Sequence, residues 1–189
     1  MNKKLAAALS GSAVLVLALS GCGDDSAEKT DAWAKKVCDQ VGPQVTKINK
    51  ANSEMDAASK DKKKSAKEVQ KTDSTAFGHI AGAYNALGNA VNKAGAPPVD
   101  DGAKLQKDAV KELKTLSAKY RGLKKQVDGL DAKDSAKFAK GLRGLAPKLD
   151  ELGKSGDKAL QKLQSGDVGK AMANQDGCKR PSSAATPSS

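Results

Sequence analysis

The stretch LQKDAVKELKTLSAKYRGLKKQV (residues 105–127) decides the fold of this 189-residue chain. Its apolar side chains recur every three or four residues, which is the spacing of one face of an α-helix. Lysine and other polar side chains fill the remaining positions, so this helix should have one buried and one solvated face. The stretch stops before Gly129, as a helix end should. The predicted buried positions are Leu105, Ala109, Leu113, Leu116, Tyr120, Leu123 and Val127.

Three further stretches show the same spacing and predict three more helices of similar length. Their apolar stripes span residues 33–55, 69–94 and 138–163. Because helices of matched length joined by short connections lie antiparallel, the pattern predicts an all-α, up-down-up-down four-helix bundle. The boundary between the first and second helices is marked by the fewest sequence signals, and we expect the turn there within residues 58–61.

Residues with strong positional preferences predict where these helices begin, end and bend. We expect Thr30 or Asp31 to cap the first helix and Asp131 to cap the last long one. Glycines should stop the second and fourth helices, and prolines should bend the first and the fourth. These residues are Gly95, Gly166, Pro43 and Pro147.

Large aliphatic and phenylalanine side chains are scarce. Past Gly21, Leu, Val, Ile and Phe together number 25 of 168 residues. A fraction below about 20% combined with a high net charge is typical of disordered chains. Because nearly all of these residues fall on the four stripes, we expect a folded bundle with a thin core.

Residues 1–22 have the organisation of a secretory signal. Two lysines precede an uncharged apolar run over residues 5–19, which is too short to span a bilayer. The run ends in LSGC (residues 19–22), which resembles the lipobox of bacterial lipoproteins. This resemblance implies that residues 1–21 are removed and that Cys22 carries a diacylglyceryl anchor, which makes the membrane a partner. An ordinary secretory peptide with an incidental cysteine is the alternative.

The rest of the chain also resembles actinobacterial small secreted lipoproteins. The similarity lies in its Ala-, Gly- and Lys-rich style and in the stretches WAKKVC (residues 33–38) and GCK (residues 177–179). It implies a position on the extracytoplasmic face of the bacterial cell membrane. It implies no particular activity.

Once Cys22 is acylated, Cys38 and Cys178 remain. In an oxidising compartment such a pair predicts one disulfide, with two free thiols or an intermolecular bridge as the alternatives. A short fifth helix, capped by Asp167, would carry Cys178 back to the first helix. The predicted organisation is a signal peptide (1–21), a membrane-proximal tether (22–30), a helical bundle domain (31–178) and a disordered Ser- and Pro-rich tail (179–189).

The chain has a net charge of +11, and only three of its 33 basic residues are arginines. We call two groups of basic residues the first and second basic clusters. They could contact anionic wall polymers or lipid headgroups. The alternative is a solvated surface that keeps the protein soluble. The first cluster is Lys60, Lys62, Lys63, Lys64 and Lys67, and the second is Lys119, Arg121, Lys124 and Lys125.

Few residue patterns suggest catalysis or metal binding. His79 is the only histidine, and we expect it on the half-buried flank of its helix. The acids Asp128, Asp131 and Asp134 lack the alternating spacing of a calcium loop. Nucleic acid is an improbable partner because arginines and aromatic residues are scarce. We therefore expect no enzyme activity, no cofactor and no metal.

The sequence thus favours a lipid-anchored interaction module that binds an envelope protein or an anionic wall or lipid surface. One alternative is a carrier of a small lipid-like ligand, with a pocket formed by the small residues Ala76, Ala83 and Gly156. A less favoured alternative is an accessory to an envelope enzyme.

Overall fold

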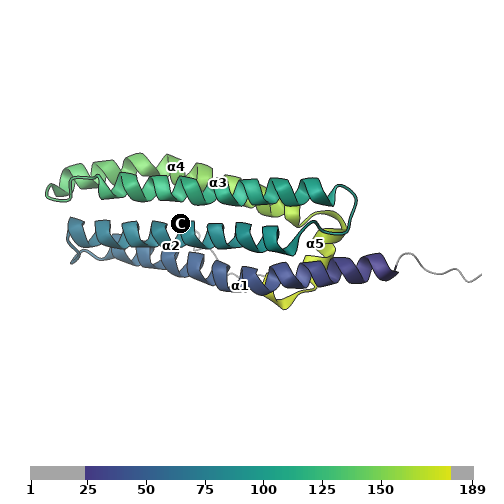
Figure 1. The fold of residues 1–189 in the computed structure, drawn as a ribbon. Coiled ribbons are helices and arrows are strands. Elements are labelled where there is room, and N and C mark those ends of the chain that lie inside the picture. Colours follow the sequence, from purple (N-terminus) through teal and green to yellow (C-terminus); the bar gives the residue numbers. More distant parts are fainter. Residues whose placement is uncertain (1–23, 180–189) are drawn as a thin grey trace, which may run out of the picture.

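The computed structural model describes residues 24–179, apart from the side chains of Asp24 and residues 156–161. Four long helices run alternately up and down, which confirms the predicted all-α bundle (Figure 1). The signal segment with Cys22 and the tail beyond Lys179 lie outside the described residues. The helices are α1 (Asp24–Lys60), α2 (Ala66–Ala94), α3 (Gly102–Asp128), α4 (Ser135–Leu163) and the short α5 (Gly166–Ala173), followed by the 3-10 turn η1 (Asp176–Cys178).

The bundle has two ends that hold different parts of the chain (Figure 1). The turn end carries the α1–α2 connection (residues 61–65) and the α3–α4 connection (residues 129–134). The disulfide end carries the start of α1, the α2–α3 connection (residues 95–101), α5 and η1. The first basic cluster therefore lies far from the residue where α1 begins.

Helices α2 and α3 form the closest pair, and polar side chains set their register. The buried Ser117 hydroxyl donates a hydrogen bond to the Ala81 carbonyl at 2.8 Å. Nearer the turn end, Gln70 Nε2 donates to the Val127 carbonyl at 2.8 Å. These bonds satisfy polar groups within the helix interface and hold the two helices antiparallel.

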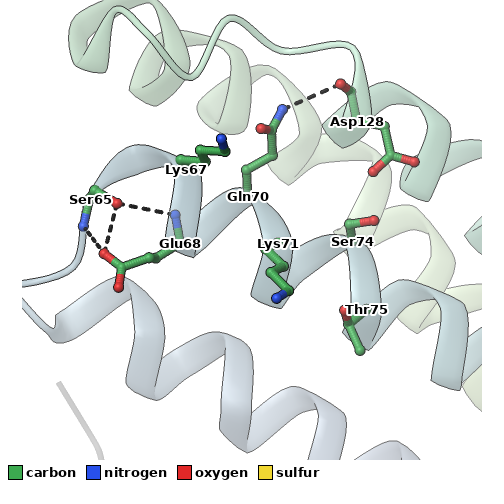
Figure 2. A pocket seen from close by; sticks show the side chains of 8 residues that line it. All are labelled: Ser65, Lys67, Glu68, Gln70, Lys71, Ser74, Thr75 and Asp128. Atoms are coloured by element: carbon green, nitrogen blue, oxygen red, sulfur yellow. Dashed lines mark hydrogen bonds between the residues drawn. The ribbon is translucent and has the colours of Figure 1, made fainter.

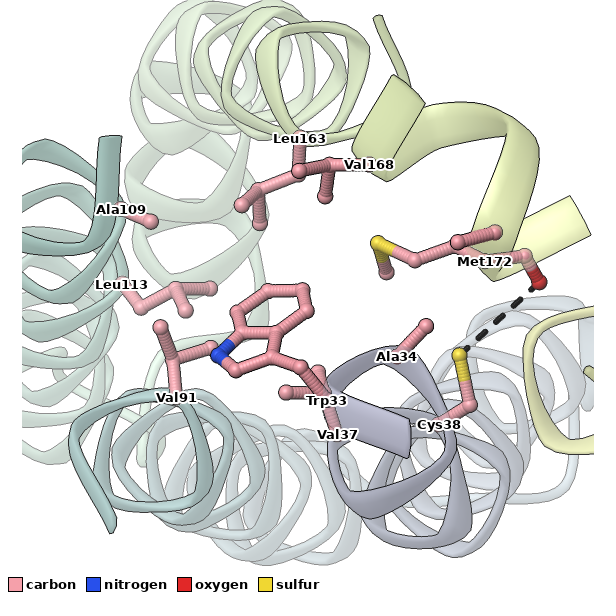
Figure 3. Close-up of a cluster of buried hydrophobic side chains, with 11 residues drawn as sticks. Trp33, Ala34, Val37, Cys38, Val91, Ala109, Leu113, Leu163, Val168 and Met172 are labelled. Atoms are coloured by element: carbon pink, nitrogen blue, oxygen red, sulfur yellow. Dashed lines mark hydrogen bonds between the residues drawn. The ribbon is translucent and has the colours of Figure 1, made fainter. Parts of the chain in front are cut away.

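The core at the disulfide end is built around Trp33, whose side chain is 4% exposed. Its indole Nε1 donates a hydrogen bond to the Gly95 carbonyl at 2.8 Å, which ties α1 to the end of α2. Figure 3 shows the ring between Val91, Leu113 and Met172, so it joins four helices including α5. Burying such a large ring adds a large apolar contact area to this end of a thin core.

A second apolar cluster occupies the middle and the turn end, and it unites the predicted stripes of all four long helices. Tyr84 and Tyr120 stack beside it, with ring centroids 5.5 Å apart. Ala159 of the fourth stripe is among the residues whose side chains are not described. The buried members are Ala51, Ala76, Phe77, Ile80, Leu116, Leu123, Val127, Leu145 and Leu152.

Helix α4 packs mainly against α3 and makes little direct contact with α1. At the disulfide end, α5 fills the space between them. Its Val168 and Met172 are buried and lie between Leu163 of α4 and Ala34 of α1 (Figure 3). The fifth helix is therefore part of the bundle core and more than a linker to the second cysteine.

The disulfide between Cys38 and Cys178 is present, which confirms the predicted pairing. The two Cα atoms are 4.9 Å apart, so η1 lies directly against α1. Gly177 makes this approach feasible, because a Cβ atom there would fall 2.2 Å from the Cys38 carbonyl oxygen. The bond closes a loop with a sequence separation of 140 residues.

The start of α1 differs from the prediction. The helix begins at Asp24, so Thr30 and Asp31 lie inside α1, whereas we expected one of them to cap its start. The Thr30 hydroxyl donates to the Ser26 carbonyl at 2.8 Å, one helical turn back. Residues 24–30 contain neither glycine nor proline, and their acidic side chains stabilise a helix N-terminus.

Two predicted caps also prove wrong. Asp134 caps α4 in place of Asp131: its Oδ1 accepts hydrogen bonds from the backbone N–H groups of Ala136 and Lys137, each at 3.0 Å. Asp131 lies within the preceding turn. In α5 the N-cap position is Ser165, and Asp167 lies in the first turn, where it forms an ion pair.

The two prolines do not interrupt their helices, since α1 runs through Pro43 and α4 runs through Pro147. The two halves of α1 are inclined to each other in Figure 1, as expected for a helix that contains proline. Continuous helices keep the two ends of the bundle about 40 Å apart at 1.5 Å per residue.

Candidate functional site

The first turn of α2 begins the candidate site, and a reciprocal pair of hydrogen bonds fixes it. The Ser65 hydroxyl accepts from the Glu68 backbone N–H at 3.3 Å, and Glu68 Oε2 accepts from the Ser65 backbone N–H at 2.8 Å (Figure 2). The Ser65 hydroxyl also donates to Glu68 Oε2 at 2.7 Å, and this bond together with that from the Ser65 backbone N–H lowers the pKa of Glu68. Because the Glu68 carboxylate already accepts from the Ser65 backbone N–H, an external anion at this helix N-terminus would lie beside a bound negative charge.

Gln70 then brings the end of α3 beside the start of α2. Its Nε2 atom donates to the carbonyl oxygens of Val127 at 2.8 Å and Leu130 at 2.9 Å. The same amide nitrogen lies 3.3 Å from the Asp128 carbonyl (Figure 2). The last turns of α3 and the first turns of α2 therefore form one continuous surface.

The structure brings the two basic clusters to the same end of the bundle. The first cluster lies at the end of α1, in the α1–α2 connection and at the start of α2, while the second lies in the last turns of α3. Lys124 lies close to α2, because a Cβ atom placed on Gly78 would be 3.8 Å from its Cδ atom. Segments distant in sequence thus share the turn end.

Most of these cations have no carboxylate partner. Lys60, Lys119 and Lys124 each pair with a nearby carboxylate, at N–O distances of 2.8, 3.8 and 2.7 Å. Within residues 24–179, no described carboxylate forms an ion pair with the other members. Those cations are Lys62, Lys63, Lys64, Lys67, Arg121 and Lys125.

The excess positive charge is concentrated at the turn end. Residues 56–73 and 119–140 contain 13 basic and seven acidic side chains. The segments at the disulfide end (24–39, 92–108 and 162–179) contain nine basic and ten acidic side chains. The bundle is therefore polarised along its length, with the positive electrostatic potential concentrated at the turn end.

Two shallow depressions lie on either side of α2 at the turn end, each about 450 Å³ in volume. The first faces α3 and is lined by Lys67, Gln70 and Asp128 among others (Figure 2). The second faces α1. Lys71 and Thr75 line both depressions. Lys71 belongs to neither basic cluster, although its position four residues after Lys67 puts it on the same helix face.

Asp73 lies on the opposite, core-facing side of α2. Its side chain is 8% exposed, and no described residue donates a hydrogen bond to it. Burial raises the pKa of Asp73 from 3.8 to about 6, because the charged form is poorly solvated there. At mildly acidic pH the Asp73 carboxyl group is therefore mainly protonated in the folded protein.

Other residues considered from the sequence form no site. His79 lies outside the core stripe of α2 and is therefore exposed, whereas we expected it to be half-buried. Within residues 24–179, no described group of three or more His, Cys, Asp or Glu side chains could hold a metal ion. Asp128 pairs with Lys124, and Asp134 caps α4.

The small residues proposed for a ligand pocket are packed. Ala76 and Ala83 are buried in the core and line neither depression. Gly156 belongs to the stretch whose side chains are not described. Among the described helices, none combines the length and the hydrophobicity needed to cross a membrane.

Comparison with protein-family models, curated proteins and solved structures finds no match for this chain.

Proposed function

We propose that this protein is a lipid-anchored module on the outer face of a bacterial cell membrane, and that its turn end binds an anionic polymer of the cell wall. The observation that carries the proposal is the convergence of both basic clusters at one end of the bundle. Exposed lysines without carboxylate partners are suited to a partner with repeated negative charges.

The direction of α1 favours a wall polymer over lipid headgroups. Helix α1 begins two residues after Cys22 and has 37 residues, which corresponds to about 55 Å. The basic end is therefore at the far end of the longest helix from the proposed anchor. In a bundle that stands on its anchor, these lysines point away from the bilayer.

The surface is suited to a flexible polymer more than to a discrete ligand. Its cations are mainly lysines, which act as mobile point charges, while arginine would bind phosphate with a fixed two-pronged geometry. The helix N-terminus at Ser65 is occupied by Glu68. Binding should then depend on the number of charges contacted and should weaken with salt.

Binding of the mature protein to isolated teichoic acid should be strongly salt-dependent. If about four lysines contact the polymer, affinity should fall roughly 50-fold between about 50 and 200 mM salt, by analogy with single-stranded polyanions. Isothermal titration calorimetry at several salt concentrations measures this slope. Vesicles of phosphatidylglycerol, titrated in parallel, distinguish a lipid surface from the polymer.

A charge-reversal pair provides the matched control. Replacing Lys62, Lys63, Lys64 and Lys67 by glutamate should abolish binding. The same change in net charge at the disulfide end should reduce binding much less. An equal loss in both variants, or binding that ignores salt, contradicts the proposal. The control substitutes the exposed residues Lys29, Lys36, Lys93 and Lys107.

The anchor has its own test. Replacing Cys22 by alanine should release the protein into the medium, because two acyl chains provide stable anchoring and an unmodified chain has none. Immunoblots of membrane and medium fractions measure the distribution. Ser20→Ala keeps a small residue before the cysteine and should leave the protein in the membrane fraction. Membrane retention of the Cys22→Ala variant is the result that contradicts lipidation.

A further inference from the structure

We propose that Lys71 is the central contact of the turn end, and that a linear phosphate-rich polymer crosses α2 at Lys71 and Thr75 and occupies the depressions on both sides. This inference rests on the proposed function and specifies the path of the polymer. Lys71 belongs to neither basic cluster.

The position of Lys71 follows from the two depressions. One lies toward α3 and includes Lys67 and Gln70, and the other lies toward α1 and includes Lys64. Lys71 and Thr75 line both, so they form the ridge that separates the two. Figure 2 shows both side chains projecting from α2 on the side away from Gln70.

The carboxylates of the α3-side depression are already engaged. Glu68 accepts hydrogen bonds from Ser65, and Asp128 accepts one from Lys124 Nζ at 2.7 Å. These bonds lower the pKa of both acids. Neither carboxylate pairs with Lys67 or Lys71 in the described residues. Asp128 is paired with the Lys124 ammonium group, so this acid repels an incoming anion less than a free carboxylate would.

The carboxylates of the α1-side depression also have internal hydrogen-bond or ion-pair partners. Asp61 Oδ1 accepts a hydrogen bond from the Lys63 backbone N–H at 2.9 Å, and Glu54 Oε1 lies 3.9 Å from Lys50 Nζ. No described carboxylate forms an ion pair with Lys64 or Lys71. The ammonium groups of Lys67 and Lys71 therefore have no ion-pair partner among the described residues. The charge of Lys64 acts on Glu68, whose pKa it helps to lower, without forming an ion pair with it.

A chain that occupies both depressions must pass over α2. An α-helix with its side chains is about 10–12 Å wide, so a single phosphate ion cannot reach both sides. Lys67 and Lys71 are one turn apart and neighbours on the helix surface, so one polymer segment can contact both. The exposed Thr75 hydroxyl adds a hydrogen-bond donor on the ridge.

The test compares Lys71→Gln with Lys107→Gln in the full-length mature protein. Lys107 is an exposed lysine at the disulfide end, and its replacement changes the net charge equally. Long-chain polyphosphate and tripolyphosphate serve as probes, and fluorescence anisotropy measures their affinity. Circular dichroism verifies that both variants keep their helix content.

Lys71→Gln should weaken binding of long-chain polyphosphate about five-fold, the loss typical of one lysine near an anionic surface, and Lys107→Gln should have little effect. Lys64→Gln and Lys67→Gln should each weaken it as well, because the two residues line opposite sides. Tripolyphosphate should bind more weakly than the long chain to the unmodified protein.

The possible failures are distinguishable. If the unmodified protein binds the long chain in a salt-dependent manner but Lys71→Gln loses no more affinity than Lys107→Gln, the inference is wrong and the proposed function stands. If the unmodified protein binds neither polyphosphate nor teichoic acid, the proposed function is wrong, and the inference fails with it.

Discussion

Replacing Cys38 by serine should lower the melting temperature of the protein by about 10–20 °C. The disulfide closes a loop with a sequence separation of 140 residues, and the chain-entropy relation assigns about 5 kcal/mol to a loop of that length. For a domain of this size, each kcal/mol corresponds to about 2–4 °C. Because the core is thin, the bond should supply a large share of the total stability.

Cys178→Ser is the matched variant, because Cys178 is only partly buried while Cys38 is 0% exposed. Loss of the bond is common to both substitutions, and only Cys38→Ser also buries a hydroxyl group. Both should shift the thermal unfolding curve measured by circular dichroism, Cys38→Ser somewhat more. A shift of one or two degrees in both would contradict a stabilising role for the bond.

Trp33 offers a local measurement of the same change. It is the only tryptophan, and Val168 and Met172 of α5 belong to the same buried cluster. Without the disulfide, α5 and η1 lose their covalent cross-link to α1 and should detach before the long helices unfold. The fluorescence of Trp33 should then shift to the red at a lower temperature than the loss of helix.

The sequence was sufficient to predict the four long helices, because each carries a complete stripe of apolar residues. Leu113, Leu116 and Leu123 illustrate this, since all three are buried on the predicted face of α3. The disulfide was also predictable, because one cysteine fits a lipobox and two remain. Periodicity and cysteine count are local or arithmetic signals, and neither depends on how the helices pack.

Packing details were not predictable in this way. The apolar stripes predict that α4 has an apolar face, but they do not predict that α5 lies between α4 and α1. The close approach of Gly177 to Cys38 depends on backbone positions far apart in sequence. The predicted helix starts were wrong for a different reason. Several acidic residues could cap α4, and only the geometry of the turn selects Asp134.

The candidate site was predictable in part. Both basic clusters can be seen in the sequence, and Ser65 followed by Glu68 has the spacing of a capping box. The role of Lys71 required the structure, because it depends on two depressions that adjoin one helix from opposite sides. The burial of Asp73 could not be predicted, because apolar periodicity does not indicate whether a charged residue on a core face is buried.

Asp73→Asn should stabilise the protein at neutral pH by about 2–3 kcal/mol. The pKa of Asp73 is about 6 in the folded protein and 3.8 in the unfolded chain, a difference worth about 1.4 kcal/mol per unit. Its contribution favours the folded state fully below the unfolded value, and it is lost as the pH rises through the folded value. Asparagine removes the charge and hence the loss.

Urea unfolding between about pH 4.5 and 7.5 measures this difference, since the wild-type free energy of unfolding should fall relative to that of the variant across this range. Hydrogen bonds lower the pKa values of Glu68, Asp128, Asp134 and Asp176, so their stabilising contributions are lost only at more acidic pH.

The exposed Asp108 provides the control for this measurement, because Asp108→Asn changes the net charge equally at a solvated position. Parallel profiles for the wild type and Asp73→Asn would mean that the Asp73 carboxylate is well solvated in the folded protein. If the free energies of unfolding of the wild type and Asp73→Asn converge at acidic pH, the turn end contains a buried carboxyl group.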